Sequence, residues 1–552
     1  MRVRHTFLGG ILVIIASMFG CLSITGLDQD FTETGAATGG GAPASSSGDG
    51  TSACGPLTEV PCYDGPAGTE GVGTCAGGTK TCNALGTAYG ECVGQALPKN
   101  EDCAAPDEDR DCDGSRPLCP WSHVFGGSAE QYGSGVAVDQ SGNVFITGSS
   151  EGEVDFGEGP LSSGIFLAKL DPSGELLWAY SFGAGATRLR AGSVSVNASG
   201  DCVLTGGYEG QINFGEGPLP VGGNLDAFLA VFDGESGDCT FSDGFGDGEE
   251  QYGTDAVLGD DGQMTLVGRF KGKIDLGSGE QTASDNYDMF MAKLDPDGNH
   301  VWSRRFGDGP DLHPHNIAFA GSDVVVVGMR RGAVNDVDFG FPCDEMTGAD
   351  DTHGDLFVAK FDNANGDCRW SHLYGEEGVQ DGFGLAVAGN GDVVVAGQFE
   401  GTVNFGIGDL VSDHLMGSNL RDIFVLKLDS AGQHVWSKAF PGAGDQRAVS
   451  AALDIDGAIV VAGYFSDSFN FNPAIPLVNL GEYDIFVAKF DASGNPGWGE
   501  RFGDGKSQEA YGLALDPSGD MLITGRFEGS VELDKTLISA GGGDIFLAKL
   551  SR

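Results

Sequence analysis

The chain has 552 residues, with 94 Gly, 21 Pro and 40% hydrophobic residues. This composition excludes a disordered or collagen-like chain and favours many short strands joined by tight turns. Its 80 acidic and 30 basic residues give a formal net charge of −50, which would repel a phosphate backbone and therefore excludes a nucleic-acid-binding function.

Residues 1–20 have the organisation of an export signal. Two arginines precede an apolar run over 7–19, which is shorter than the roughly 20 apolar residues of a spanning helix. Gly20 and Cys21 resemble the end of the lipobox of bacterial lipoproteins, although the two residues before them depart from its usual pattern. We therefore predict lipidation at Cys21 and anchoring to the outer membrane. Plain secretion, with Cys21 as part of a linker, is the alternative.

A spacer and a cysteine-rich segment follow the signal. Residues 21–53 are rich in Gly, Ser, Thr and Ala, which predicts a flexible linker. Residues 54–120 combine eight cysteines with few large apolar residues, which in an exported chain predicts a small disulfide-rich module. Zinc binding is the alternative, but the segment contains no CxxC pair. The sequence leaves open how these cysteines pair: Cys54, Cys62, Cys75, Cys82, Cys92, Cys103, Cys112 and Cys119.

The stretch DRDCDG within this module has the start of a calcium-loop pattern. Asp109, Asp111 and Asp113 occupy the first, third and fifth positions, and Gly follows at the sixth. Pro120 stands where the closing carboxylate would be required. An acidic turn constrained by disulfides is the alternative interpretation to a bound calcium ion.

From residue 121 onward the chain contains an internal repeat. Each Trp is followed, four residues later, by an aromatic residue, and Phe241 fills the one gap in the series. These strands recur at intervals of 57 to 68 residues, at Trp121, Trp178, Phe241, Trp302, Trp370, Trp436 and Trp498. A small-residue stretch, a β-branched run, a variable loop and a segment similar to DIFVAKFD follow each strand. Four strands in about 60 residues are typical of a propeller blade.

The count of strands predicts how the ring closes. The first Trp strand precedes all the other repeats, whereas the last unit, ending at 544–550, has no Trp strand after it. Seven blades of four strands each are obtained only if the strand of Trp121 completes the last blade. We therefore predict an all-β chain in which 121–552 form a seven-bladed β-propeller with four strands per blade, closed by its N-terminal strand.

The seven copies in one frame resemble the bacterial SBBP repeat family of seven-bladed β-propellers. The resemblance implies this fold and an exported or surface-attached protein, but it implies little about mechanism.

Candidate ligand-binding residues are sought where the repeats diverge. In a propeller, the loops that lead into the innermost strand and those between the second and third strands open on the same face. The divergent residues on this face are Arg188, Arg190, His313, His315, Asp350, Asp351, His353 and His414. The histidines and aspartates are suitable ligands for a transition metal, and solvated loop histidines are the alternative.

Four further cysteines lie within the repeats. Cys202 and Cys239 fall near turns on one face, so we predict a disulfide between them, whereas Cys343 and Cys368 fall towards opposite faces and are a doubtful pair.

The function expected from these observations is non-catalytic. The chain shows no local pattern of a catalytic nucleophile and no phosphate-binding loop. We expect a monomeric binding or scaffolding protein of the cell surface, with a protein or glycan ligand and a lipid anchor in the outer membrane. The alternatives are a propeller hydrolase or lyase with a metal or acidic site, and a purely structural envelope component.

Overall fold

The computed structural model describes residues 54–97 and 120–551, apart from 66–68, 73, 285, 308, 310, 333–336, 344–352, 377, 415–419 and 473–474. All elements within these ranges are strands, and none of the residues described forms a helix able to cross a membrane. The predicted export signal and linker lie outside the described residues. The same holds for the following predicted site residues: Cys21, Cys103, Asp109, Asp111, Cys112, Asp113, Cys119, Asp350 and Asp351.

The described part of the smaller of two compact units comprises 54–64 and 77–95. Its strands β1 (Glu59–Cys62) and β2 (Gly78–Thr81) form one antiparallel pair. Disulfides join Cys54 to Cys82 and Cys62 to Cys92. Cys75, elsewhere in the chain, is disulfide-bonded as well. These bridges fit the predicted disulfide-rich module, because so short a ladder offers little apolar surface to bury.

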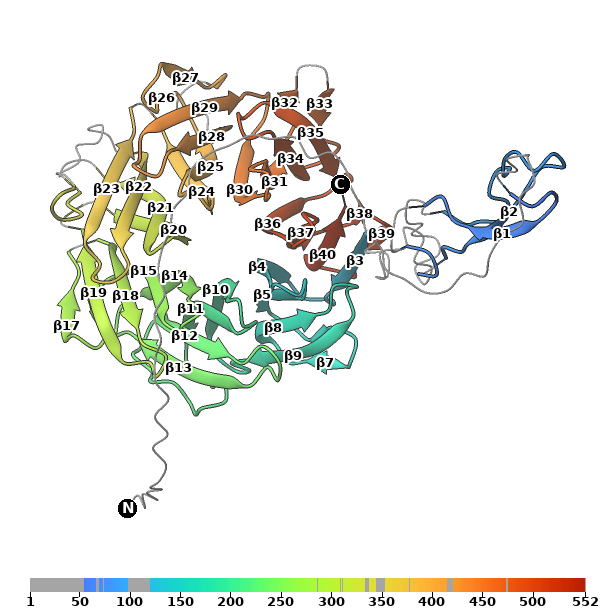
Figure 1. The fold of residues 1–552 in the computed structure, drawn as a ribbon. Coiled ribbons are helices and arrows are strands. Elements are labelled where there is room, and N and C mark those ends of the chain that lie inside the picture. Colours follow the sequence, from blue (N-terminus) through green and yellow to red (C-terminus); the bar gives the residue numbers. More distant parts are fainter. Residues whose placement is uncertain are drawn as a thin grey trace, which may run out of the picture. The chain divides into compact units, whose positions relative to one another are not determined.

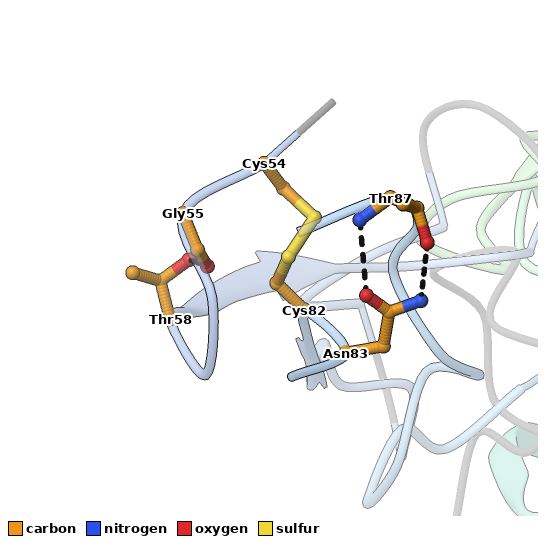
Figure 2. The surroundings of a disulfide bond; sticks show 6 residues. All are labelled: Cys54, Gly55, Thr58, Cys82, Asn83 and Thr87. Atoms are coloured by element: carbon orange, nitrogen blue, oxygen red, sulfur yellow. Dashed lines mark hydrogen bonds between the residues drawn. A yellow bond between two sulfur atoms is a disulfide. The ribbon is translucent and has the colours of Figure 1, made fainter. Parts of the chain in front are cut away.

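Polar contacts brace the turn beside the first disulfide (Figure 2). The side chain of Asn83 accepts a hydrogen bond from the Thr87 backbone N–H at 3.0 Å and donates one to Thr87 Oγ1 at 2.8 Å. Across the bridge, the Thr58 hydroxyl donates to the Gly55 carbonyl at 2.6 Å. Side-chain hydrogen bonds therefore stabilise each turn, and the disulfide joins the two turns to one another.

Residues 120–551 form a ring of seven four-stranded antiparallel sheets (Figure 1). Blade 1 contains β4 (Gln131–Val138), β5 (Val144–Ser150), β8 (Gly164–Leu170) and β9 (Leu176–Phe182). Blade 2 contains β10 (Arg188–Val196), β11 (Cys202–Glu209), β12 (Asp226–Phe232) and β13 (Cys239–Phe245). Blade 3 contains β14 (Gln251–Leu258), β15 (Met264–Phe270), β18 (Asp288–Leu294) and β19 (His300–Phe306). Blade 4 contains β20 (Asp311–Ala320), β21 (Asp323–Arg331), β22 (Gly354–Asp362) and β23 (Cys368–Tyr374).

The remaining blades repeat this order. Blade 5 contains β24 (Gln380–Val387), β25 (Val393–Phe399), β28 (Asp422–Leu428) and β29 (His434–Phe440). Blade 6 contains β30 (Gln446–Leu453), β31 (Ile459–Phe465), β34 (Asp484–Phe490) and β35 (Pro496–Phe502). Blade 7 contains β36 (Gln508–Leu515), β37 (Met521–Phe527), β40 (Asp544–Leu550) and β3 (Trp121–Phe125).

Short hairpins extend the loops between the second and third strands of five blades. They are β6 (Val154–Asp155) with β7 (Pro160–Leu161), β16 (Lys273–Asp275) with β17 (Glu280–Thr282), β26 (Thr402–Asn404) with β27 (Asp409–Val411), β32 (Ser468–Asn472) with β33 (Ile475–Val478), and β38 (Ser530–Glu532) with β39 (Thr536–Ile538).

The core lies between neighbouring blades. The second and third strands are covered on both faces, and every residue of β5 and β8 is buried. This explains why these strands are mainly apolar instead of alternating. One buried cluster, for example, joins Val267 and Met291 of blade 3 to Val326 and Phe357 of blade 4.

The predicted closure of the ring is confirmed. Strand β3 pairs antiparallel with β40, with Trp121 opposite Lys549 and Phe125 opposite Ile545. Figure 1 shows the two strands, one near each end of the propeller chain, side by side in one sheet. The N-terminal strand therefore supplies the outer edge of blade 7.

Each Trp on an outer strand contacts the next blade. The indole N–H of Trp121 donates to the Pro172 carbonyl at 3.1 Å, and that of Trp302 donates to the Asn363 carbonyl at 3.1 Å. Both carbonyls belong to the turn between the third and fourth strands of the following blade. In that turn, Gly174 (φ 88°) lies against the Trp121 ring, so closely that a Cβ atom there would meet it. The recurring Trp and turn Gly thus fasten each blade to its neighbour.

The predicted preference between the two cysteine pairs of the propeller was wrong. Cys202 and Cys239 are free, whereas Cys343 and Cys368 form a disulfide with a Cα–Cα distance of 5.9 Å. The strand register gives the reason: Cys202 lies opposite Phe232, which in turn lies opposite Cys239. Two strand spacings, about 9.6 Å, therefore separate the Cα atoms of the two cysteines, beyond the reach of a disulfide.

Candidate functional site

A β-bulge interrupts the innermost strand of every blade. In β4, for example, Gly133 lies opposite Gly148 and Gly135 lies opposite Thr147, so Ser134 has no partner in the ladder. The shift falls at the corresponding place in the other six strands, and in β10 it spans Gly192 and Ser193. A bulge leaves one residue free of the pairing and turns its side chain out of the sheet.

These bulge residues gather around the propeller axis. All of them line a cavity of about 740 Å³ on the face where the loops between blades open. They differ from blade to blade, although the strands around them repeat. The seven bulge residues are Ser134, Gly192, Thr254, His315, Phe383, Val449 and Tyr511. We refer to this cavity as the loop-face cavity.

One part of the cavity wall combines an aromatic ring with a paired histidine. His315 Nε2 lies 3.0 Å from Asp381 Oδ1, and the His315 ring lies against the Phe383 ring, tilted by 35° with 4.5 Å between centroids. These three residues come from the innermost strands of blades 4 and 5. The contact presents a polar edge and an apolar face to the same space.

A buried carboxylate links three blades at the cavity floor. Asp255 of β14 accepts hydrogen bonds from the Ser193 hydroxyl of blade 2 and, at 2.9 Å, from the Ile317 N–H of blade 4. Burial raises the pKa of Asp255 to about 6, although these donors favour the charged form. A perturbed carboxyl group near an axis is a feature of some active sites, but here its oxygens are occupied by donors that hold the blades together.

The opposite part of the rim carries charge that is neutralised within the protein. Arg526 lies 2.9 Å from Glu130 and 2.6 Å from Glu528. The hydroxyl of Tyr511 donates to Glu509, and burial raises the pKa of that tyrosine. These groups offer hydrogen-bonding edges and ring faces without a net positive charge.

The structure does not bring the predicted histidines together. We had expected His313 and His315 in a loop, but both lie on the innermost strand β20. His414 is turned to the Gly444 carbonyl (3.0 Å) and to Asp422 (3.5 Å), and His353 directly precedes β22. Within the part of the chain that the structure describes, no three His, Cys, Asp or Glu side chains are grouped as metal ligands.

The two predicted arginines also belong to an innermost strand, β10. Arg188 forms an ion pair with Glu250 at 2.8 Å, and Arg190 is exposed. Of the six predicted ligand-face residues that the structure describes, only His315 lines the loop-face cavity. The other bulge residues escaped the sequence analysis, although their position, three residues after the Gln that begins five of the innermost strands, was visible in the repeat.

The fold and this cavity define the protein as a seven-bladed β-propeller whose divergent residues meet at one end of the axial channel. Residues 121–154 match the SBBP family model, which is described as Beta-propeller repeat.

Similarity to curated proteins is limited. The chain is 24% identical over 184 residues to an uncharacterized WD repeat-containing protein, L264, of Acanthamoeba polyphaga mimivirus, over 30% of this chain and 13% of that protein. It is 28% identical over 130 residues to the regulatory protein FlaEY of Caulobacter vibrioides, over 23% of this chain and 14% of that protein. The chain thus spans about one seventh of the length of either relative.

Among solved structures, a europium-containing methanol dehydrogenase aligns with a TM-score of 0.38 and 10% identity, over 86% of this chain and 88% of that chain.

Proposed function

We propose that this protein is a non-catalytic binding or scaffolding protein of the cell envelope. Its propeller would be displayed on a stalk attached to the outer membrane through Cys21, and its ligand, a protein or a glycan, would bind in the loop-face cavity. The disulfides are those of a chain that folds in an oxidising compartment, which supports an extracellular or envelope location.

The observation that carries the proposal is the variation at the seven bulges. A framework residue that recurs in every blade has the same structural task each time, as the Trp contacts show. The bulge residues range from Gly192 to Tyr511 and His315, yet all line one cavity. The fold does not require a different side chain at each of the seven bulges. Binding of an asymmetric ligand does require different side chains around the cavity.

The test compares the two ends of the channel. Phe383 lines the loop-face cavity, and Phe319 lines a cavity of about 780 Å³ on the opposite face. Purified envelope glycans and proteins are presented to the full-length protein by biolayer interferometry. Phe383→Ser should weaken binding about tenfold or more, and Phe319→Ser should leave it unchanged. Equal effects of the two substitutions would contradict the assignment of the site.

The enzyme alternative is tested in the same samples. Mass spectrometry of the bound glycan or protein after incubation would show whether a bond has been broken. Turnover that disappears in Asp255→Asn or His315→Ala would overturn the non-catalytic proposal and favour a hydrolase or lyase. Binding without turnover would support it.

A further inference from the structure

A group of basic and aromatic side chains lies at the rim of the propeller between blades 2 and 4, beside the loop-face cavity. Arg269 of β15 lies opposite Tyr252 in the strand register. Its guanidinium carbon lies 5.9 Å from the centroid of the Tyr252 ring and 5.1 Å from that of Tyr287. An Nη1 hydrogen of Arg269 is donated to His313 Nδ1. We call Arg190, Arg269, Lys271, Tyr252, Tyr287 and His313 the rim cluster.

His313 acts here as a neutral acceptor. Burial and then the charge of Arg269 lower the pKa of His313 to about 4, so the imidazole is uncharged at neutral pH and can accept through Nδ1. Two rings and one imidazole therefore hold the guanidinium in a fixed orientation. Burial lowers the pKa of Arg269 as well, but a guanidinium remains charged in proteins.

This guanidinium forms no ion pair among the described residues, and Glu250 attracts it only from a longer distance. Glu250, the acid of this neighbourhood, is already bonded to Arg188 and to the Tyr287 hydroxyl. Exposed Arg190 also forms no ion pair within the described ranges. In a chain with 80 acidic and 30 basic residues, an oriented arginine without a carboxylate is unusual.

Blade 7 provides the comparison. Arg526 occupies the same position on the second strand of its blade, opposite Glu509 in the register. There the protein supplies two carboxylates, Glu130 at 2.9 Å and Glu528 at 2.6 Å. The rim cluster therefore supplies a guanidinium to which the protein provides no anion. Its N–H groups have the fork geometry that matches a carboxylate or a phosphate.

The rest of the ligand is indicated by the adjoining cavity. Its lining combines the polar residues Thr254, Asn316 and Ser450 with the aromatic residues Tyr132 and Phe383. This alternation matches a sugar ring, whose C–H face packs on an aromatic ring and whose hydroxyls seek polar partners. The net charge of −50 disfavours a polyanion, because each further negative charge would be repelled.

We propose that the rim cluster binds the single anionic group, a carboxylate or a phosphate, of a small saccharide whose ring enters the loop-face cavity. The inference rests on the proposed binding function and names the ligand class for the same site. It assigns a specificity-determining role to Arg269, assisted by Arg190.

The experiment is an isothermal titration of the full-length protein with four probes: glucuronate, glucose 6-phosphate, glucose and acetate. Glucuronate and glucose differ only at C6, so their ratio of dissociation constants isolates the anionic group, and glucose 6-phosphate distinguishes phosphate from carboxylate. We expect one of the two anionic sugars to bind about tenfold or more tightly than glucose.

Three variants test whether the rim cluster causes this difference in affinity. Arg269→Gln and Arg190→Gln should each reduce the ratio of dissociation constants towards one, and Arg269→Lys, which keeps the charge but lacks the fork, should reduce it in part. Arg190 is exposed, so its variant tests the inference even if Arg269→Gln disturbs folding. Arg304→Gln removes an outer-strand arginine that pairs with Asp367 at 3.1 Å and should leave the ratio unchanged.

Several outcomes would overturn the inference. Glucose that binds as tightly as both anionic sugars would reject the anionic specificity and leave the proposed binding function standing. Acetate that binds as tightly as glucuronate would show a site for an adventitious ion only. If none of the probes binds, the ligand class is wrong, and the envelope-binding assay with Phe383→Ser then decides separately whether the proposed function also fails.

Discussion

Replacing residues 121–125 with a Gly/Ser segment of equal length should destabilise the propeller and make it self-associate. The segment contributes Trp121 and Phe125, which are 9% and 5% exposed, and a five-residue ladder to β40. Loss of the Phe125 side chain alone, in Phe125→Ala, should cost about 3–5 kcal/mol of unfolding free energy, because it leaves a cavity in the core between blades 7 and 1. The full replacement should cost more and expose the edge of β40 to pairing with other molecules.

Urea denaturation followed by tryptophan fluorescence gives the stability change, and light scattering after gel filtration gives the oligomeric state. Val124→Ala is the matched control, because this neighbouring side chain is 39% exposed and should change stability by less than about 0.5 kcal/mol. A Gly/Ser variant that remains monomeric with the denaturation midpoint of the parent protein would refute the argument that β3 closes the ring.

Three further predictions follow from the thiols, a buried acid and the N-terminus. Alkylation of the denatured, unreduced protein should label Cys202 and Cys239 but not Cys343, and label on Cys343 would contradict the disulfide seen here. Asp255 has a pKa of about 6 when folded and 3.8 as its ordinary value, so its protonated form favours folding and up to ~3 kcal/mol of stability is lost as the pH rises from about 4 to about 6. As the pH rises through this window, the urea midpoint should therefore fall more steeply for the parent protein than for Asp255→Asn. Parallel plots of midpoint against pH would contradict the raised pKa of Asp255. Metabolic labelling with palmitate should mark the parent and not Cys21→Ser, and an unlabelled parent would reject lipidation.

The blade number and the closure could be predicted from the sequence because seven copies of one pattern reinforce one another. A single WSRRF or DIFVAKFD is ambiguous, but the Trp frame fixes the register of every outer strand, and an excess strand at the front has one place to go. The apolar middle strands follow from their burial on both faces.

The candidate site was harder to predict because it depends on one-residue shifts. We expected His313 and His315 in a loop because the repeat diverges there, yet both lie on a strand, and Pro314 lies directly beside the bulge at His315, where Pro is tolerated. The wrong pairing of Cys202 with Cys239 has a similar origin. Both are near turns along the chain, but a third strand lies between them, and only the register reveals it.

The seven bulges also separate what the fold needs from what can change. A bulge residue forms no part of the ladder, so exchanging Val449 or Thr254 for another side chain breaks no hydrogen bond between strands. Each of the seven bulge residues around the axis can therefore be exchanged independently of the others. A lineage, or a protein engineer, can rewrite the shape and polarity of the cavity one blade at a time while the scaffold stays as it is.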